Sequence, residues 1–131
     1  MENPELKLGD ILAQQRTDLA IERTILASVN SIQAWIRTSL SMIGFGFTIY
    51  KFLQSLQNDG LSLMRPQTPR NVGLILIGLG TLSIVFGMLD YWLTHRGLQK
   101  KYGFRIKIYP IVLALLIVIL GLLLFITIIL E

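Results

Sequence analysis

Residues 109–130, YPIVLALLIVILGLLLFITIIL, form an apolar segment without a single charged side chain. About 20 residues that rise about 1.5 Å each cross the roughly 30 Å hydrocarbon core of a bilayer. Two further segments, 34–56 and 72–93, have a similar length and include few charges. Because lipid offers the backbone no hydrogen-bond partners, such segments must be helices there. The sequence therefore predicts an all-α integral membrane protein with three transmembrane helices.

The composition favours a surface that faces lipid. Of the 131 residues, 53% are hydrophobic and 15% are charged, whereas about 25% charge is usual in soluble domains. The length is that of one domain. The absence of cysteine excludes disulfides and thiolate metal sites. No signal or transit peptide is visible at the N-terminus, so we expect a bacterial inner-membrane protein that inserts through its own spans.

The two loops between the predicted spans differ in positive charge. Loop 94–108 contains several basic residues and no acid, whereas loop 57–71 contains two arginines and Asp59. Lys and Arg in short loops favour the cytoplasmic side, so loop 94–108 is expected inside and loop 57–71 outside. The N-terminus is then cytoplasmic and the C-terminus is external. The basic residues of the cytoplasmic loop are Arg96, Lys100, Lys101, Arg105 and Lys107.

Two roles for these basic residues stay open. They can set the topology and touch anionic membrane lipids, or they can form a specific site for phosphate or a polyanion. His95, the only histidine, has neither cysteine nor an acidic cluster beside it. We therefore expect an interfacial polar residue there and no metal site. No cofactor and no nucleic-acid partner is expected.

Residues 5–33 lead into the first predicted span without a break. Asn3, Pro4 and Glu5 are the residue types that begin a helix, and neither Gly nor Pro occurs within 10–43. We therefore expect one long helix. Its cytoplasmic, amphipathic part, 5–33, continues directly into the span 34–56.

Basic residues recur at seven-residue spacing along this helix, with Asn30 and Gly44 at two of the six positions. Seven residues turn a helix about 700°, just short of two turns, so residues at this spacing form a slowly drifting stripe. The residues three and four positions later share its face, and they include Ala20, Ala27 and Ala34 among leucines. The stripe is thus expected within a helix-packing face. We call it the basic stripe, and its members are Arg16, Arg23, Asn30, Arg37, Gly44 and Lys51.

Two environments for the basic stripe stay open. The side chains can extend to water or lipid phosphate near helix ends, which is the interpretation favoured for Lys51. Alternatively, the stripe faces a polar interior, because one residue per subunit of a cyclic oligomer becomes a ring. Stacked basic rings suit anions or phosphates. On this second interpretation the anion-facing candidates are Arg16, Arg23, Arg37 and Lys51.

Arg37 and Asp90 are expected at a common depth, each about one turn inside the inner boundary of the membrane. Charges within a span usually pair with each other or face a cavity. We therefore expect an Arg37–Asp90 ion pair, with the alternative that each side chain reaches its own headgroup region.

Small residues on the first two spans are expected to allow close helix packing. Ser83 and Gly87 have the small-xxx-small spacing, and the first span adds Gly44 and Gly46. Span 109–130 is apolar on all sides, which predicts an outer position against lipid.

The runs LAIERTILA, 19–27, and AWIRTSLSMIGFGFTIYKF, 34–52, resemble the domain of unknown function (DUF) 202 family, the YidH-like small inner-membrane proteins. The resemblance is close over these runs and extends to the other spans in layout. It implies three spans and a cytoplasmic N-terminus. Asn30 and Ser31 stand where the family pattern has Arg-Thr, which leaves one level of the basic stripe uncharged.

The same family is distantly similar to the membrane part of the yeast vacuolar transporter chaperone complex, which makes polyphosphate and passes it through the membrane. That similarity implies that Arg23 and Arg37 face an anion here. The first functional hypothesis is therefore a homo-oligomer with span 34–56 at its centre, forming an anion or polyphosphate site or channel. The second is a non-conducting scaffold or accessory subunit that docks another membrane protein. No catalytic motif is present, so no enzyme is expected.

Overall fold

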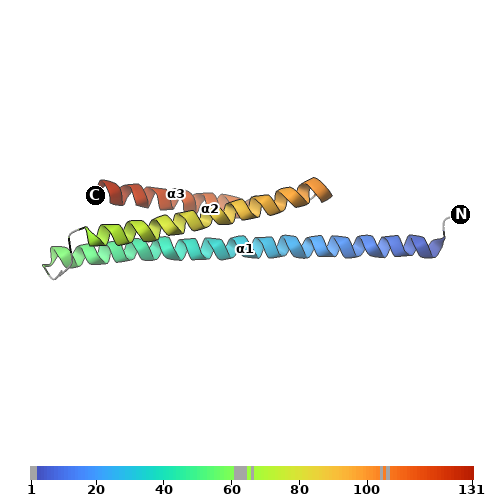
Figure 1. Ribbon diagram of the computed structural model, residues 1–131, viewed down its shortest axis with the longest axis horizontal. Helices are drawn as coiled ribbons and strands as arrows, with labels where there is room; N and C mark the ends of the chain where they lie inside the picture. Colours follow the sequence, from blue (N-terminus) through green and yellow to red (C-terminus); the bar gives the residue numbers. More distant parts are fainter. Residues whose placement is uncertain (1–2, 61–64, 66, 104, 106) are drawn as a thin grey trace.

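The chain forms three helices in a computed structural model (Figure 1). The described residues are 3–60, 65, 67–103, 105 and 107–131. The helices are α1, Pro4–Asn58; α2, Thr68–Tyr102; and α3, Tyr109–Leu130. α2 returns along α1, and α3 lies beside α2, while the N-terminal part of α1 extends beyond both (Figure 1). The regular secondary structure of the described residues is thus entirely α-helical.

α1 runs without interruption for 55 residues. The Asn3 side chain accepts a hydrogen bond of 3.3 Å from the Glu5 backbone N–H, and Pro4 occupies the first turn. Proline at this position loses no helical hydrogen bond, and an acid beside it favours the positive end of the helix dipole. Residues 5–33 and 34–56 therefore form one continuous helix, and the placement of 5–33 in the cytoplasm and of 34–56 in the membrane stays a prediction.

α2 is longer than the expected span 72–93. It continues to Tyr102, where Gly103 takes a positive φ of 71° and donates its N–H to the Gln99 carbonyl at 3.0 Å. A left-handed glycine is a common helix terminator. The expected loop 94–108 is therefore wrong over its first part, because Arg96, Lys100 and Lys101 lie on α2. A fall in hydropathy along the sequence indicates where a helix would leave lipid. The helical backbone itself continues beyond that point. α3 has the expected bounds.

α2 and α3 are long and apolar enough to cross a membrane. Their most apolar windows have mean hydropathies of 2.4 and 3.4, and only 28% and 22% of those residues are buried. A core helix of a soluble protein would be mostly buried, so these side chains need an apolar surrounding that the chain itself does not supply. The two helices thus indicate a membrane protein. α1 does not meet the same criterion over its described residues.

α1 and α2 pack closely through three glycines of α2 at seven-residue spacing, Gly73, Gly80 and Gly87. A Cβ atom added to them would lie 2.8, 2.9 and 2.6 Å from side-chain atoms of α1. The α1 residues that meet them are Tyr50, Ile43 and Trp35, respectively. Larger side chains would force the two helices apart.

The buried residues lie along this contact and the adjoining edge of α3. Ser39 is fully buried on α1 and donates a hydrogen bond of 2.6 Å to the Gly80 carbonyl oxygen of α2. Gly121 brings α3 against Thr81 and Ile43. The largest hydrophobic cluster draws on all three helices: Val29, Ile32, Ile43, Ile84, Tyr91, Ala114 and Ile117. The fold is therefore an α1–α2 hairpin with α3 added along one side.

Gly87→Ala is expected to destabilise the fold by about 1–3 kcal/mol, because its methyl group would overlap Trp35 and overpack the contact. Gly97→Ala on the same helix is the matched control, since no atom lies within 4 Å of its Cβ position. Alanine there should stabilise α2 by about 0.5–1 kcal/mol. Circular dichroism during denaturant titration of the detergent-solubilised protein measures both, and effects of the same sign would contradict the close packing.

Candidate functional site

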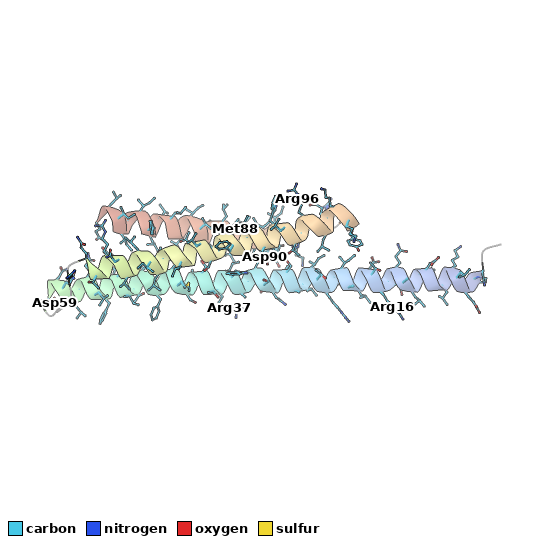
Figure 2. All side chains as sticks on the ribbon, in the orientation of Figure 1. Arg16, Arg37, Asp59, Met88, Asp90 and Arg96 are labelled. Atoms are coloured by element: carbon cyan, nitrogen blue, oxygen red, sulfur yellow. The ribbon has the colours of Figure 1, made fainter. Side chains whose placement is uncertain are left out.

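The basic stripe lies on the side of α1 opposite α2. All six of its members are exposed. Ser39 points at α2, and Arg37, two residues or about 200° earlier, points away from it. Figure 2 shows Arg16 and Arg37 along the edge of α1 that neither α2 nor α3 covers. Within one chain, the expectation that the stripe shares the packing face is therefore wrong, because a different heptad set packs on α2.

The neighbours of the stripe are uncovered as well. Ala20, Ala27 and Ala34 are exposed, and Gly44 has no atom within 4 Å of its Cβ position. Three leucines on the same side are about half exposed. We call this surface the free face of α1; it consists of the basic stripe with Leu19, Ala20, Leu26, Ala27, Ala34 and Leu40. It combines basic, small and apolar residues, most of which have no partner among the described residues; Lys51 is an exception, and Leu19 and Leu26 also border a groove lined by Arg105 and Lys107.

Arg37 lies beside the apolar part of α2. Trp35 meets Gly87 and Tyr50 meets Gly73, so this stretch of α1 runs alongside residues 73–87 of α2. Arg37 is two residues, or about 3 Å, further into that stretch than Trp35. Its side chain has no hydrogen bond or ion pair with any residue that the structure describes. A guanidinium without a partner thus sits level with the apolar segment of α2.

The expected Arg37–Asp90 ion pair is not formed among the described residues of the chain. Both side chains are exposed. Trp35 and Gly87 lie at the same level of the two antiparallel helices. Asp90 is three residues from this level in one direction, and Arg37 is two residues from it in the other direction. The two residues are therefore about 7 to 8 Å apart along the helix axes. Arg37 also points away from α2. The expectation fails because depth was estimated without knowing the register of the two helices.

Lys51 forms an ion pair with Glu131 just beyond the end of α3, with Nζ 3.0 Å from Oε1. A seven-residue step falls about 20° short of two turns, so the stripe turns by about 40° between Arg37 and Lys51. This drift carries Lys51 round to α3. Its charge is therefore matched within the chain, unlike that of Arg37.

Lys51 belongs to a polar cluster that joins the three helices where α1 ends and α2 begins. The Tyr50 hydroxyl donates a hydrogen bond of 2.8 Å to Glu131, and the Gln54 amide donates one of 3.3 Å to that hydroxyl. Arg70 donates to the Ile129 carbonyl at 2.7 Å. The hydrogen bond from Tyr50 and the charge of Lys51 hold the pKa of the Glu131 carboxyl below its ordinary value. Sequence patterns did not indicate this cluster, because its residues come from three distant segments.

His95 is buried within the chain. It is 4% exposed, and its ring lies 4.0 Å from that of Tyr91. Nδ1 lies 3.0 Å from the Tyr91 carbonyl oxygen, which can only accept, so Nδ1 carries the proton. The Ser28 hydroxyl is 3.5 Å from the same nitrogen, and Nε2 has no hydrogen-bond partner in the described structure. The His95 side chain therefore packs inside the helix contact, and its position at the membrane interface stays a prediction.

The basic residues of α2 and the following connection do not gather into one site. The Arg96 guanidinium lies 4.9 Å from the centre of the Trp92 ring, and the Lys101 ammonium 5.8 Å from that of Tyr102. Lys100 is exposed. Arg105 and Lys107 line a groove against α1 together with Asp18, Leu19, Glu22, Ile25 and Leu26.

The small residues expected to pack helices divide between two surfaces. Gly46 and Gly87 lie inside the α1–α2 contact, where a Cβ on Gly46 would be 2.8 Å from Leu76. Ser83 is partly buried. The alanines and Gly44 lie on the free face. The seven-residue repeat of Gly73, Gly80 and Gly87 was the sequence signal for the covered side of α2, and the small-xxx-small spacing did not capture it.

Residues 16–97 match the model of a family described as a domain of unknown function, DUF202. The match begins at the first arginine of the basic stripe and ends soon after His95. It therefore covers the α1–α2 hairpin and its free face and leaves α3 outside. No curated protein and no solved structure matches the chain.

The polar cluster at Glu131 should stabilise the fold in a pH-dependent way. Because the folded pKa lies below the ordinary 4.5, its contribution is fully present above that value and is lost as the pH falls through the folded pKa. Denaturant unfolding should therefore separate Glu131→Gln from the unmodified protein at neutral pH, and the difference should vanish in acid. Asp59→Asn, an acid outside the cluster, is the control. A difference for Glu131→Gln that persists unchanged in acid would contradict this assignment.

Proposed function

The chain belongs to the DUF202 family, and we propose that it is a homo-oligomeric membrane protein with α1 at its centre. In this proposal the basic stripe forms an anion- or polyphosphate-binding site or channel. The observation that carries the proposal is Arg37, which is uncovered and unpaired among the described residues beside the apolar part of α2.

The register of the hairpin supports α1 as a third membrane span. If α2 crosses the bilayer through its apolar segment, then residues 35–50 of α1 lie at the same depth. The basic residues 96–107 lie near the end where the long N-terminal part of α1 projects, as a cytoplasmic side would require. We therefore propose a bacterial inner-membrane protein with a cytoplasmic N-terminus and an external C-terminus.

An arginine within a membrane span is favoured by a polar partner. Arg costs about 2.5–3.5 kcal/mol at the centre of a membrane helix on insertion scales and less near its ends, and arginines within a span usually face a bundle interior or a water-filled cavity. α2 and α3 cannot supply that interior, since Arg37 points away from both. Further copies of α1 can, because the small residues of the free face permit close approach. Self-association thus gives Arg37 the surroundings that a single chain lacks.

Rings of arginine favour an anion between them. Like charges around one axis repel each other, and a bound phosphate offsets that repulsion while accepting charge-assisted hydrogen bonds. Lys51 contributes little to this site because Glu131 already matches its charge. The principal residues are then Arg23 and Arg37, about 21 Å apart along α1, with uncharged Asn30 midway. A polymeric anion can contact both levels, whereas one phosphate cannot.

The free face also supports the second candidate function, a scaffold or accessory subunit. Leu19, Leu26 and Leu40 are 56%, 51% and 49% exposed there, and an apolar heptad surface suits docking of another helix. This alternative predicts a stable complex with a different membrane protein, recovered by pull-down, and no intrinsic flux.

Disulfide cross-linking tests self-association directly, because the chain contains no cysteine. Ala34→Cys on the free face should form a covalent dimer on oxidation in native membranes, since neighbouring copies of α1 face one another there. Leu82→Cys, an exposed position on α2, is the matched control and should cross-link little. Equal cross-linking of both variants, or of neither, would contradict an oligomer centred on α1.

Arg23→Ala and Arg37→Ala should each weaken polyphosphate binding about tenfold, as expected for losing a hydrogen bond to a charged group. Binding by the purified protein in nanodiscs and anion conductance in planar bilayers provide the two readouts. Arg65→Ala is the control, because Arg65 is exposed and lies outside the stripe. If the stripe variants bind and conduct like the unmodified protein, the anion site is wrong even where the oligomer persists.

A further inference from the structure

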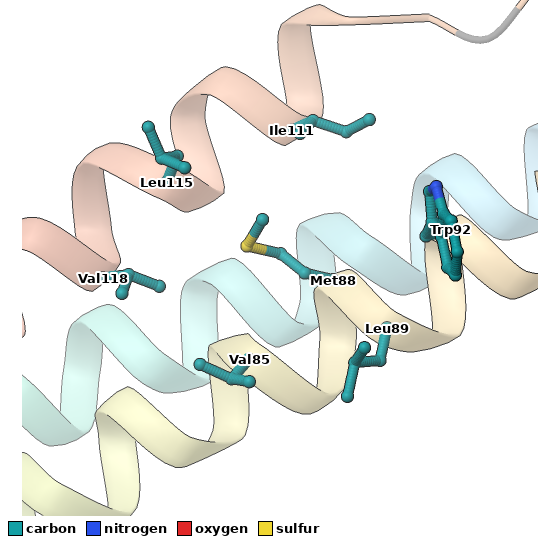
Figure 3. Close-up of a pocket in the computed structure, with 7 residues that line it drawn as sticks. All are labelled: Val85, Met88, Leu89, Trp92, Ile111, Leu115 and Val118. Atoms are coloured by element: carbon teal, nitrogen blue, oxygen red, sulfur yellow. The ribbon is translucent and has the colours of Figure 1, made fainter.

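An apolar groove of about 350 Å³ lies between α2 and α3, on a different side of the molecule from the free face of α1. Figure 3 shows Met88 reaching from α2 toward α3 and Trp92 standing at one end. This volume is within the range of about 300–1,000 Å³ that is usual for ligand pockets. The groove is lined by Val85, Met88, Leu89, Trp92, Ile111, Leu115 and Val118.

A positive charge stands at the Trp92 end of the groove. One side of α2 presents five residues at helical spacing. They are Val85, Met88, Leu89, Trp92 and Arg96. The Arg96 guanidinium lies over the Trp92 ring, 4.9 Å from its centre. Figure 2 shows Arg96 on the side of α2 away from α1. The groove thus has an apolar length and one basic end.

Close contact between α2 and α3 limits the groove at the other end. One turn before Val85, Thr81 meets Gly121, where an added Cβ would overlap the Thr81 hydroxyl oxygen. From Val85 to Arg96 the groove and its charge extend over eleven residues, or about 16 Å. Half of a hydrocarbon core of about 30 Å is about 15 Å. The distance therefore matches one leaflet.

We propose that this groove binds one acyl chain of an anionic phospholipid, with the phosphate held by Arg96. A neighbouring helix is a poorer occupant, because it is about 10–12 Å wide and would need contact along the whole of α3. The groove instead ends after about three turns, which suits a narrow chain anchored by its head. Trp92 covers the junction of chain and head, where tryptophan is favoured at membrane interfaces. The site needs α2 and α3 in the membrane but does not depend on oligomerisation or on the basic stripe.

Quenching of Trp92 fluorescence by chain-brominated lipid tests the proposal. In a Trp35→Phe background, Trp92 is the remaining tryptophan. The protein is placed in phosphatidylcholine vesicles that contain a minor fraction of brominated phosphatidylglycerol or, separately, of brominated phosphatidylcholine. Brominated phosphatidylglycerol should be enriched at Trp92 about fivefold over the neutral lipid, which corresponds to about 1 kcal/mol from one basic residue.

Two pairs of variants locate the site. Arg96→Gln should remove the preference for the anionic lipid, whereas Lys100→Gln, one turn further along α2, should keep it. Val85→Phe should reduce quenching by filling the groove, and Leu93→Phe, exposed outside the groove, should not. Native mass spectrometry of the unsubstituted chain gives a readout that is independent of Trp35, and it should show retained phosphatidylglycerol that Arg96→Gln loses.

Three outcomes would overturn the proposal. Equal quenching by the two lipids means that Arg96 recognises no headgroup. Absence of quenching by either lipid means that protein covers the groove in the membrane. Competition by free inorganic phosphate, with Val85→Phe behaving like the unsubstituted groove, means that the site takes phosphate without an acyl chain.

Discussion

The close contact between α1 and α2 is the constraint on which the rest of the structure depends. Gly73, Gly80 and Gly87 leave no room for a Cβ, and the Ser39 hydroxyl bonds to a backbone carbonyl across the contact. Glycine at seven-residue spacing keeps one side of α2 flat along its length, so α1 stays in a single register over about four turns. That register turns the basic stripe outward and sets Arg37 beside the apolar part of α2.

Three basic residues, Lys51, Arg96 and Arg37, have different surroundings in this structure. Near the end of α1, drift of the stripe brings Lys51 to Glu131, and the two neutralise each other. On α2, Arg96 rests on Trp92 at the end of an apolar groove. On the free face, Arg37 has no ion pair among the described residues and lies among small and apolar neighbours. Lys51 is paired with a carboxylate of its own chain, whereas the lipid headgroup at Arg96 and the anion at Arg37 are the partners that we propose.

The helices were predictable because each depends on local properties of the sequence. An uninterrupted run without Gly or Pro predicts α1, and an uncharged apolar run predicts α3 with its observed bounds. The end of α2 was not predictable from hydropathy, since a helix that leaves an apolar region can continue until a residue such as Gly103 ends it. The Arg37–Asp90 pair failed for a similar reason. It required an axial register that side-chain shapes at Trp35 and Gly87 determine, and no spacing within either segment specifies it.

By itself, the sequence determined that the chain is helical, that two segments suit a membrane, and that basic residues share one side of α1. These are properties of period and composition, which each segment carries without reference to the others. Only the tertiary structure decided which side of α1 is covered, that His95 is buried, and that Lys51 meets Glu131. Two different heptad sets run along α1, and both combine small and apolar residues. The tertiary structure selects the set that contains Trp35, Ile43 and Tyr50, whose side chains pack against the glycines of α2.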